Sequence, residues 1–546
     1  MRDHPKALPY LFFTEMWERF GYYLMIGIFF LYMTDTDKNG MGFERATSAD
    51  VYGTFIALVY VTPFIGGLLA DRVLGYRVSI VIGGILMGIG YLLLAIPQNL
   101  NTFYLSLAII IIGNGFFKPN ISTLLGNLYS EKQYEDKKDD GYNIFYMGIN
   151  IGAFICNFFA AYLRNNYGWG YAFAAAGIGM FIGVAVFLFG MKNYSHADVR
   201  KEANPAEAGV VTLLSSVLLP AIITGFLAWN IPGNLLGTDS ADAFIFGTIP
   251  IIGFFLWILV KSSPAEKPRI KALLAVFGIV IIFWAIFKQN GTALTTWAEY
   301  YTDRAIPEWM EKPAGALGMV QEIPGEPDTF AVYDNQFRRE KDPATGEFVT
   351  AVTNHPYFIN VPENERPAPG SSLNVVSTEI YQSINPFFII VFTPLVVWFF
   401  SFLRRRKREP STPGKIGWGL FISALSTLVT IGAVYACHNG EMKASVGWLF
   451  GTYAVISLGE LCLSPMGLSM VSKVSPPRLT GLMMGGWLLS TSIGNKLSGI
   501  LATMWDSYEH KANFFWVNFV LLAIACLGLL AMLKWLKRIF EEQGIR

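Results

Sequence analysis

The chain has 546 residues, of which 53% are hydrophobic and only 15% are charged. A soluble domain carries about 25% charged residues, so this chain is too apolar to cover a water-exposed surface, and we expect a polytopic protein of the lipid bilayer. The 41 basic and 40 acidic residues nearly cancel, which argues against nucleic acid as a partner, and the four cysteines lack the spacing of a disulfide scaffold or a metal site.

Apolar segments long enough to span a bilayer follow one another along the whole chain, and turns rich in Pro and Gly separate them. We predict fourteen transmembrane helices. Their ranges are 8–34, 50–71, 78–97, 102–128, 141–163, 170–191, 209–230, 242–261, 270–302, 377–403, 415–437, 446–472, 480–505 and 513–536.

The loops alternate in charge. With the N-terminus placed in the cytoplasm, Lys and Arg are several times more frequent in the cytoplasmic segments than in the short outer loops. Basic residues favour the cytoplasmic side, so we predict that both termini are cytoplasmic. The first span is too long and too polar for a cleaved signal peptide.

The segment 303–376 departs from this compact pattern. It is polar and contains nine prolines. Alternating apolar residues at 329–333 and 346–349 suggest short strands. We expect an extracytoplasmic insertion, and we favour a structural cap over a functional loop.

The first span carries three charges on one helix face. Glu15, Glu18, Arg19 and Tyr22 are spaced i, i+3, i+4 and i+7. An ionisable group at membrane depth costs about 3 kcal/mol or more, so it usually faces a water-filled cavity. Two carboxylates beside one guanidinium leave a surplus negative charge that a proton can neutralise, which predicts proton coupling. The alternative is a static buried ion pair.

Several other spans also have one polar face, which predicts a water-filled central cavity. The stripes are Asn114, Lys118 and Ser122; Asn143, Tyr146, Asn150 and Asn157; and Ser457, Glu460 and Ser464. Lys288 and Lys496 are the remaining ionisable residues well inside spans, and the sequence suggests no role for Lys496. Aromatic residues near the cavity, such as Tyr60 and Trp487, can pack or bind.

The turn after the second span carries a further charged group. Asp71, Arg72 and Arg77 lie in a Gly-containing stretch at 66–77. An acid there can cap the next helix or pair with a base across the turn. We predict a cytoplasmic gate built from such pairs.

Together these motifs resemble the proton-dependent oligopeptide transporter family of the major facilitator superfamily. The first-span signature E-x-x-E-R-F-x-Y-Y is complete from Glu15 to Tyr23. The stretch 113–120 looks like the family's lysine motif, 145–152 like its fifth-helix motif and 458–465 like its glutamate helix, while the loop at Asp71 is similar to the superfamily signature.

The resemblance implies an all-α membrane protein with the major facilitator fold. It consists of two six-helix bundles, 1–192 and 269–546, with two extra linker helices in 193–268 and a long extracytoplasmic insertion. It also implies import of di- and tripeptides with protons, by alternating access, in a bacterial inner membrane. The proton is the coupling ion, and no cofactor or metal is expected.

The resemblance also suggests residue roles. Glu15, Glu18 and Arg19 correspond to the proton-coupling cluster, Lys118 to the base that engages the peptide carboxylate, and Glu460 to the acid that faces its ammonium. Other positions match the family's pocket lining: Tyr22, Tyr23, Tyr60, Asn150, Gln382, Asn385, Ser464 and Trp487.

The chain departs from the family at two linked positions. Many members have an arginine where this chain has Ile26, and an acid where it has Lys288; in those members the two side chains pair across the outer gate. We hypothesise that Lys288 replaces the missing arginine as a substrate-binding base and that gating uses other contacts. Because some relatives move nitrate and other anions, an alternative substrate is another small anionic or zwitterionic solute, such as nitrate or a modified amino acid.

Two functions from other classes are less well supported. An intramembrane enzyme would need a nucleophile or metal set, yet no histidine accompanies the acids inside the spans. A receptor or scaffold would use the segment 303–376 as its binding part.

Overall fold

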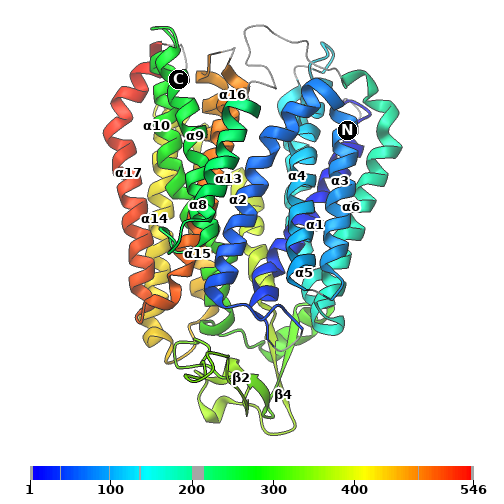
Figure 1. The fold of residues 1–546 in the computed structure, drawn as a ribbon, viewed down its shortest axis with the longest axis vertical. Helices are drawn as coiled ribbons and strands as arrows, with labels where there is room; N and C mark the ends of the chain where they lie inside the picture. Colours follow the sequence, from blue (N-terminus) through cyan, green and yellow to red (C-terminus); the bar gives the residue numbers. More distant parts are fainter. Residues whose placement is uncertain are drawn as a thin grey trace.

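The computed structural model describes residues 4–36, 39–97, 99–134, 137–198, 214–476 and 479–542. The long helices run roughly side by side along the longest axis of the molecule (Figure 1). Both termini lie at one end, which we call the termini end, and the segment 303–376 covers the opposite end, which we call the insertion end (Figure 1).

Each predicted span contains a helix, although residues 209–213 lie outside the described part. The helices are α1 (Leu8–Thr34), α2 (Arg45–Leu69), α3 (Tyr76–Leu94), α4 (Leu100–Leu128), α5 (Lys138–Tyr167), α6 (Trp169–Gly190), α8 (Leu219–Trp229), α9 (Asp239–Lys261), α10 (Lys267–Phe287), α13 (Ile384–Arg405), α14 (Thr412–Ala436), α15 (Val446–Val474), α16 (Thr480–Thr503) and α17 (Lys511–Glu542).

Eleven of the described helical segments are long and apolar enough to cross a membrane. The helix α8 adds a shorter apolar segment, Ser215–Trp229, together with the π-helical turn η5 (Leu214–Leu218). The helices α1 and α16 are not among the eleven, and both carry charged or polar side chains along their length. The molecule is therefore a helical, multi-pass membrane protein, and the count of fourteen spans stays a prediction.

The helices pack in two groups that repeat the same pattern of neighbours. In the first group α1 packs against α5 and α6, α3 against α4 and α6, and α2 against α4. In the second group α10 packs against α16 and α17, α14 against α15 and α17, and α13 against α15. Each helix of one group thus has a counterpart at the same position in the other. This is the predicted architecture of two six-helix bundles, and α8 and α9 pack mainly on each other.

The two bundles meet along two seams. The first seam joins α2 to α16, and the second joins α5 to α13 and to the 3-10 helix η10 (Thr378–Ser383). In the first seam the backbones touch, because a Cβ atom added to Gly53 would lie only 2.7 Å from the Cα of Gly499. Glycine is required there, since any side chain would force the helices apart.

The predicted span 270–302 is not one continuous helix. After α10 the chain forms the short turns η6 (Lys288–Gly291), α11 (Ala293–Thr296) and η7 (Trp297–Tyr301). The break lies at Thr292, whose backbone leaves the helical region with φ −129° and ψ −86°. The break follows Asn290 and Gly291, residues of low helix propensity.

The insertion folds into two small antiparallel pairs. After the helix α12 (Glu308–Ala316), β1 (Val320–Pro324) pairs with β4 (Ser372–Val376), and β2 (Asp328–Ala331) pairs with β3 (Thr350–Thr353). The strand predicted at 329–333 is present in its first half. In the range predicted at 346–349, Gly346 adopts a positive φ of 73° and Phe348 forms an isolated antiparallel bridge with Lys341, and the regular strand β3 begins after it, at Thr350.

Candidate functional site

The charged face of α1 forms one buried cluster. Arg19 donates two hydrogen bonds to Glu18, and its Nε lies 3.4 Å from a carboxylate oxygen of Glu15. The rings of Tyr22 and Tyr23 lie 5.0 and 6.0 Å from the Arg19 guanidinium carbon. The two carboxylates therefore share one guanidinium. Oε2 of Glu15 has no hydrogen-bond partner among the described residues, so this oxygen can carry a proton.

The close approach of α5 keeps this cluster dry. A Cβ atom added to Gly152 would lie 2.4 Å from the carbonyl oxygen of Met16 and 3.3 Å from the Cβ of Arg19. The glycine of the fifth-helix motif thus lets α5 cover the charged face of α1. Charges held in such a low-dielectric setting interact strongly, which couples the protonation of either acid to the position of Arg19.

Tyr60 of α2 brings together two lysines from opposite bundles. Nζ of Lys118, on α4, lies 4.0 Å from the centre of the Tyr60 ring, and Nζ of Lys288, at the end of α10, lies 5.6 Å from it. Both lysines are partly exposed, and neither has a carboxylate partner among the described residues. Two ammonium groups without a carboxylate partner among the described residues can both pair with an anion that enters this interior.

An acid of the second bundle lies close enough to Lys288 to interact with its charge. Glu460, on α15, is partly exposed and forms no ion pair with the described residues. The amide of Asn385, on α13, donates hydrogen bonds to Glu460 at 3.1 Å and to Ser457 at 2.9 Å. The bond to Glu460 orients the carboxylate while leaving its charge available to a cation.

The remaining predicted pocket residues differ in their surroundings. The Asn150 amide donates to the Tyr146 carbonyl oxygen at 2.9 Å, one turn earlier in the same helix, and the Ser464 hydroxyl has no partner among the described residues. The Gln382 amide donates to the Thr295 hydroxyl at 2.8 Å and so binds the broken segment after α10. Trp487 is only 3% exposed and packs within the core of the second bundle, so in this conformation it supports the interior rather than lining it.

At the termini end, the predicted gate residues have different partners. Asp71 accepts a hydrogen bond from the Tyr76 hydroxyl at 2.7 Å. Arg77 donates to Asp198 at 2.8 Å, and Asp198 also accepts from the Tyr76 backbone N–H. The Arg72 side chain lies outside the described residues. Sequence reasoning missed Asp198, because no periodic pattern marks a residue in the connection after α6.

Sequence reasoning also missed several buried pairs at the insertion end. Arg164 of α5 lies 3.1 Å from Glu379 of η10, and Arg304 lies 3.6 Å from Glu299 of η7. Lys496 of α16 pairs with Asp50 of α2. The partners of Arg164 and Lys496 are distant in sequence, and Arg304 and Glu299 are five residues apart across the end of η7, so no helical spacing pattern could have revealed these pairs.

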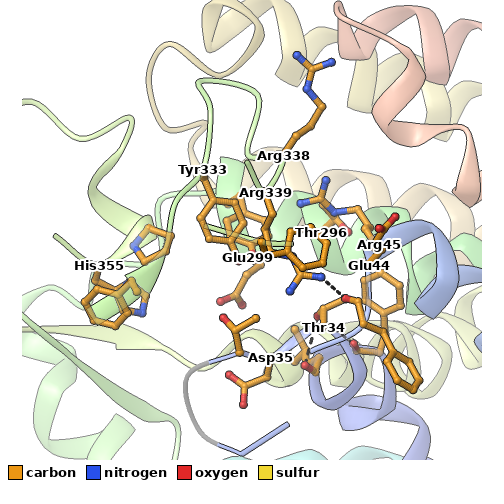
Figure 2. A pocket seen from close by; sticks show the side chains of 18 of the residues that line it. Thr34, Asp35, Glu44, Arg45, Thr296, Glu299, Tyr333, Arg338, Arg339 and His355 are labelled. Atoms are coloured by element: carbon orange, nitrogen blue, oxygen red, sulfur yellow. Dashed lines mark hydrogen bonds between the residues drawn. The ribbon is translucent and has the colours of Figure 1, made fainter. Parts of the chain in front are cut away.

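A cavity of about 390 Å³ lies beneath the insertion. Figure 2 shows Asp35 and Glu44 of the α1–α2 connection and Arg45 of α2 around this space, together with Glu299 and residues of the insertion such as Arg339. Most of its charges are already paired, since Arg45 pairs with Asp506 and Arg339 donates to backbone carbonyl oxygens of the α1–α2 connection. The residues that line the cavity therefore serve mainly as polar contacts between the insertion and the bundles. No cluster of His, Cys, Asp and Glu suited to a metal occurs among the described residues.

The sequence matches a family model and individual proteins over most of its length. A model of the POT family matches residues 77–320 and 371–517. A "Di-/tripeptide transporter" of Lactococcus lactis is 29% identical over 97% of this chain and 95% of its own length, and an "Uncharacterized transporter YclF" of Bacillus subtilis is 29% identical over 97% of this chain and 94% of its own.

Solved structures share the fold over nearly the whole chain. Crystal structures of a peptide transporter POT, one in complex with sulfate and one, a mutant, in complex with alafosfalin, superpose with a TM-score of 0.75 and 28% identity. Each match covers 98% of this chain and 96% of the other.

Proposed function

This chain belongs to the POT family, a family of transporters rather than enzymes, and from that premise we propose that it imports di- and tripeptides together with protons. The observation that carries the proposal is the placement of two unpaired ammonium groups, Lys118 and Lys288, and one unpaired carboxylate, Glu460, around the same interior. Every unmodified small peptide has a C-terminal carboxylate and an N-terminal ammonium group, whatever its side chains.

Binding of such a substrate joins the two bundles. Lys118 belongs to the first bundle, whereas Lys288 and Glu460 belong to the second. The peptide carboxylate lies between the two lysines, and the ammonium group meets Glu460. A ligand that contacts both bundles stabilises the state in which they are close together, and so favours closure around the substrate.

The proton enters through the α1 cluster. Protonation of Glu15 or Glu18 removes the surplus negative charge and weakens the hold on Arg19, which permits the loaded carrier to reorient. In the topology that we propose, the protein lies in a bacterial inner membrane, both termini are cytoplasmic and the insertion end is outside. The proton is the coupling ion, and the mechanism uses no cofactor.

Uptake of labelled dialanine into proteoliposomes with an imposed pH gradient tests the substrate and the coupling together. Excess unlabelled peptides should compete with the label, and nitrate should not. Competition by nitrate but not by peptides would instead establish the alternative, a carrier of small anions, which the two unpaired lysines also support.

Substitution of Lys288 tests the anion site. We expect Lys288→Ala to weaken peptide binding about tenfold, the effect of losing one charged hydrogen bond. Lys312→Ala is the matched control, because this lysine is exposed on α12. Unchanged affinity and uptake in Lys288→Ala would show that Lys118 binds the carboxylate alone.

Substitution of Glu18 tests proton coupling. We expect Glu18→Gln to abolish uptake driven by the pH gradient while exchange of labelled for unlabelled peptide continues, because exchange needs no net proton movement. Glu308→Gln, at an exposed acid of α12, is the control. Uptake by Glu18→Gln that still follows the pH gradient would contradict the assignment.

A further inference from the structure

Lys496 is the most completely buried charged side chain of the first seam. It is 0% exposed and lies on α16, and its Nζ is 2.6 Å from an oxygen of Asp50, on α2, which is 9% exposed. The pair therefore joins the two bundles through the interior. Such a pair is costly to desolvate and is stable only when the remaining hydrogen bonds of both partners are also satisfied.

Those hydrogen bonds are all made. The Lys496 ammonium donates to Asp50, to Thr54 at 2.7 Å and to Ser240 at 2.8 Å, which uses its three N–H groups. Asp50 also accepts from the hydroxyl of Ser240 and, at 2.9 Å, from that of Thr238. Since Thr238 and Ser240 begin α9, the cluster joins three parts of the molecule: the first bundle, the second bundle and the linker hairpin α8–α9.

The cluster lies where α2 and α16 are in closest contact, near the insertion end. The Ser492 hydroxyl donates to the Ala57 carbonyl oxygen at 2.6 Å, and the Asn495 amide donates to that of Ile56 at 3.2 Å. Towards the termini end the contact between the same two helices is apolar: a Cβ atom added to Gly485 of α16 would lie 2.8 Å from the Phe64 ring of α2. A small pocket of about 60 Å³ lies beside this contact, and residues of α9 and η5 also line it. The polar contacts between α2 and α16 are thus at the insertion end.

We infer that Asp50, Lys496 and Ser240 form a gate that holds the insertion end closed, and that the linker hairpin is part of this gate. To open this end, α2 must leave α16, and the two charges must be separated and hydrated. Ser240 and Thr238 hold Asp50 from a third element, so they position its carboxylate for Lys496. This contact lies on a different pair of helices from the positions of Ile26 and Lys288.

The inference rests on the proposed transport function, but it can be tested without a substrate. In full-length protein carrying Ala57→Cys, a membrane-impermeant maleimide reaches the new thiol only when the first seam opens. Ala57 is fully buried, and the four native cysteines are also buried, so the chain without this cysteine gives the background. The maleimide is added to right-side-out and to inside-out vesicles. Comparing the two shows which side of the membrane the insertion end faces, so an inverted topology is not mistaken for the absence of a gate.

We expect Asp50→Asn and Lys496→Met each to raise the labelling rate from the insertion end about tenfold or more, since each shifts the population towards the open state. Ser240→Ala should raise it by a smaller factor. Thr248→Ala is the matched control, because the Thr248 hydroxyl bonds the carbonyl oxygen of Ile245 in its own helix and no other described residue, and it should leave the rate unchanged. The double variant Asp50→Asn/Lys496→Met should label no faster than the faster single variant, because both act through one contact.

Unchanged labelling in variants that elute as monodisperse protein and still exchange peptide would overturn the gate. Ser240→Ala removes a single oxygen atom and retains the ion pair, so this variant still tests the gate if the charge variants do not fold. A rate equal to that of the parent in Ser240→Ala would exclude the linker hairpin from the gate. If the wild-type protein takes up no peptide and the gate variants still show the expected increases in labelling rate, the proposed substrate is overturned and the gate stands.

Discussion

The two seams between the bundles occupy equivalent positions in the repeat, yet they are built differently. The first seam, α2 with α16, has touching backbones at Gly53 and Gly499 and the buried pair of Asp50 with Lys496. The second seam, α5 with η10 and α13, has no comparable glycine contact among the described residues and is joined by polar side chains.

The second seam also includes the insertion. Asn165, near the end of α5, donates to the hydroxyl of Ser377 at 2.6 Å and to the backbone of Val320 in β1 at 2.9 Å. Arg164 beside it pairs with Glu379. The insertion therefore reinforces the second seam, whereas the linker hairpin reinforces the first. The packing pattern shared by the two bundles determines where they meet. The insertion and the linker hairpin, which lie outside that pattern, supply much of the polar contact.

The largest effect should come from breaking the buried pair of the second seam. Arg164→Met leaves the carboxylate of Glu379, which is 0% exposed, without its nearest base, and we expect a loss of about 3–5 kcal/mol of stability. Thermal unfolding in detergent measures it. The double variant Arg164→Met/Glu379→Leu should recover most of the loss. A single variant as stable as the wild type would mean that the second seam does not depend on this pair.

A smaller effect should follow from overpacking the first seam. In Gly53→Leu the new side chain meets the backbone of α16, and we expect a loss of about 1–3 kcal/mol together with faster labelling of a cysteine at residue 57. Gly278→Leu on α10 is the control, because a Cβ atom there meets nothing within 4 Å. Normal labelling in Gly53→Leu would show that the seam opens and closes without backbone contact.

The smallest effect should come from a charge that touches neither seam. Glu409, in the connection between α13 and α14, accepts from Arg404 and Lys415 at 2.6 Å each, and these bonds lower the pKa of Glu409 to about 2. A depressed carboxyl pKa stabilises the folded state above the ordinary value of about 4.3, and this contribution disappears as the pH falls towards 2.

We therefore expect Glu409→Gln to lower stability at pH 6 by less than about 1 kcal/mol, because Arg404 is largely exposed, and to match the wild type near pH 2. Thermal unfolding across this pH range measures the difference. Labelling at residue 57 should not change. A change in labelling would mean that the α13–α14 connection acts on the first seam.

The fold and part of the site could be predicted from the sequence. The fourteen apolar ranges each contain a helix, and the i, i+3, i+4 spacing of Glu15, Glu18 and Arg19 predicts the cluster that the structure shows. Both predictions use neighbours within one helix, where the period of 3.6 residues fixes the geometry. The meeting of Lys118 and Lys288 at Tyr60 could be expected only from the resemblance, because the three residues lie on three helices.

The sequence by itself determined which segments are helical, which helix faces are polar and which family the chain resembles. The tertiary structure decided which distant charges meet: Lys496 with Asp50, Arg77 with Asp198 and Arg164 with Glu379. It also decided that the predicted span 270–302 breaks at Thr292 and that the insertion lies across the second seam. The physical reason is that hydrophobic periodicity specifies which face of a helix is buried, whereas the packing of the helices determines which residue on a neighbouring helix that face contacts.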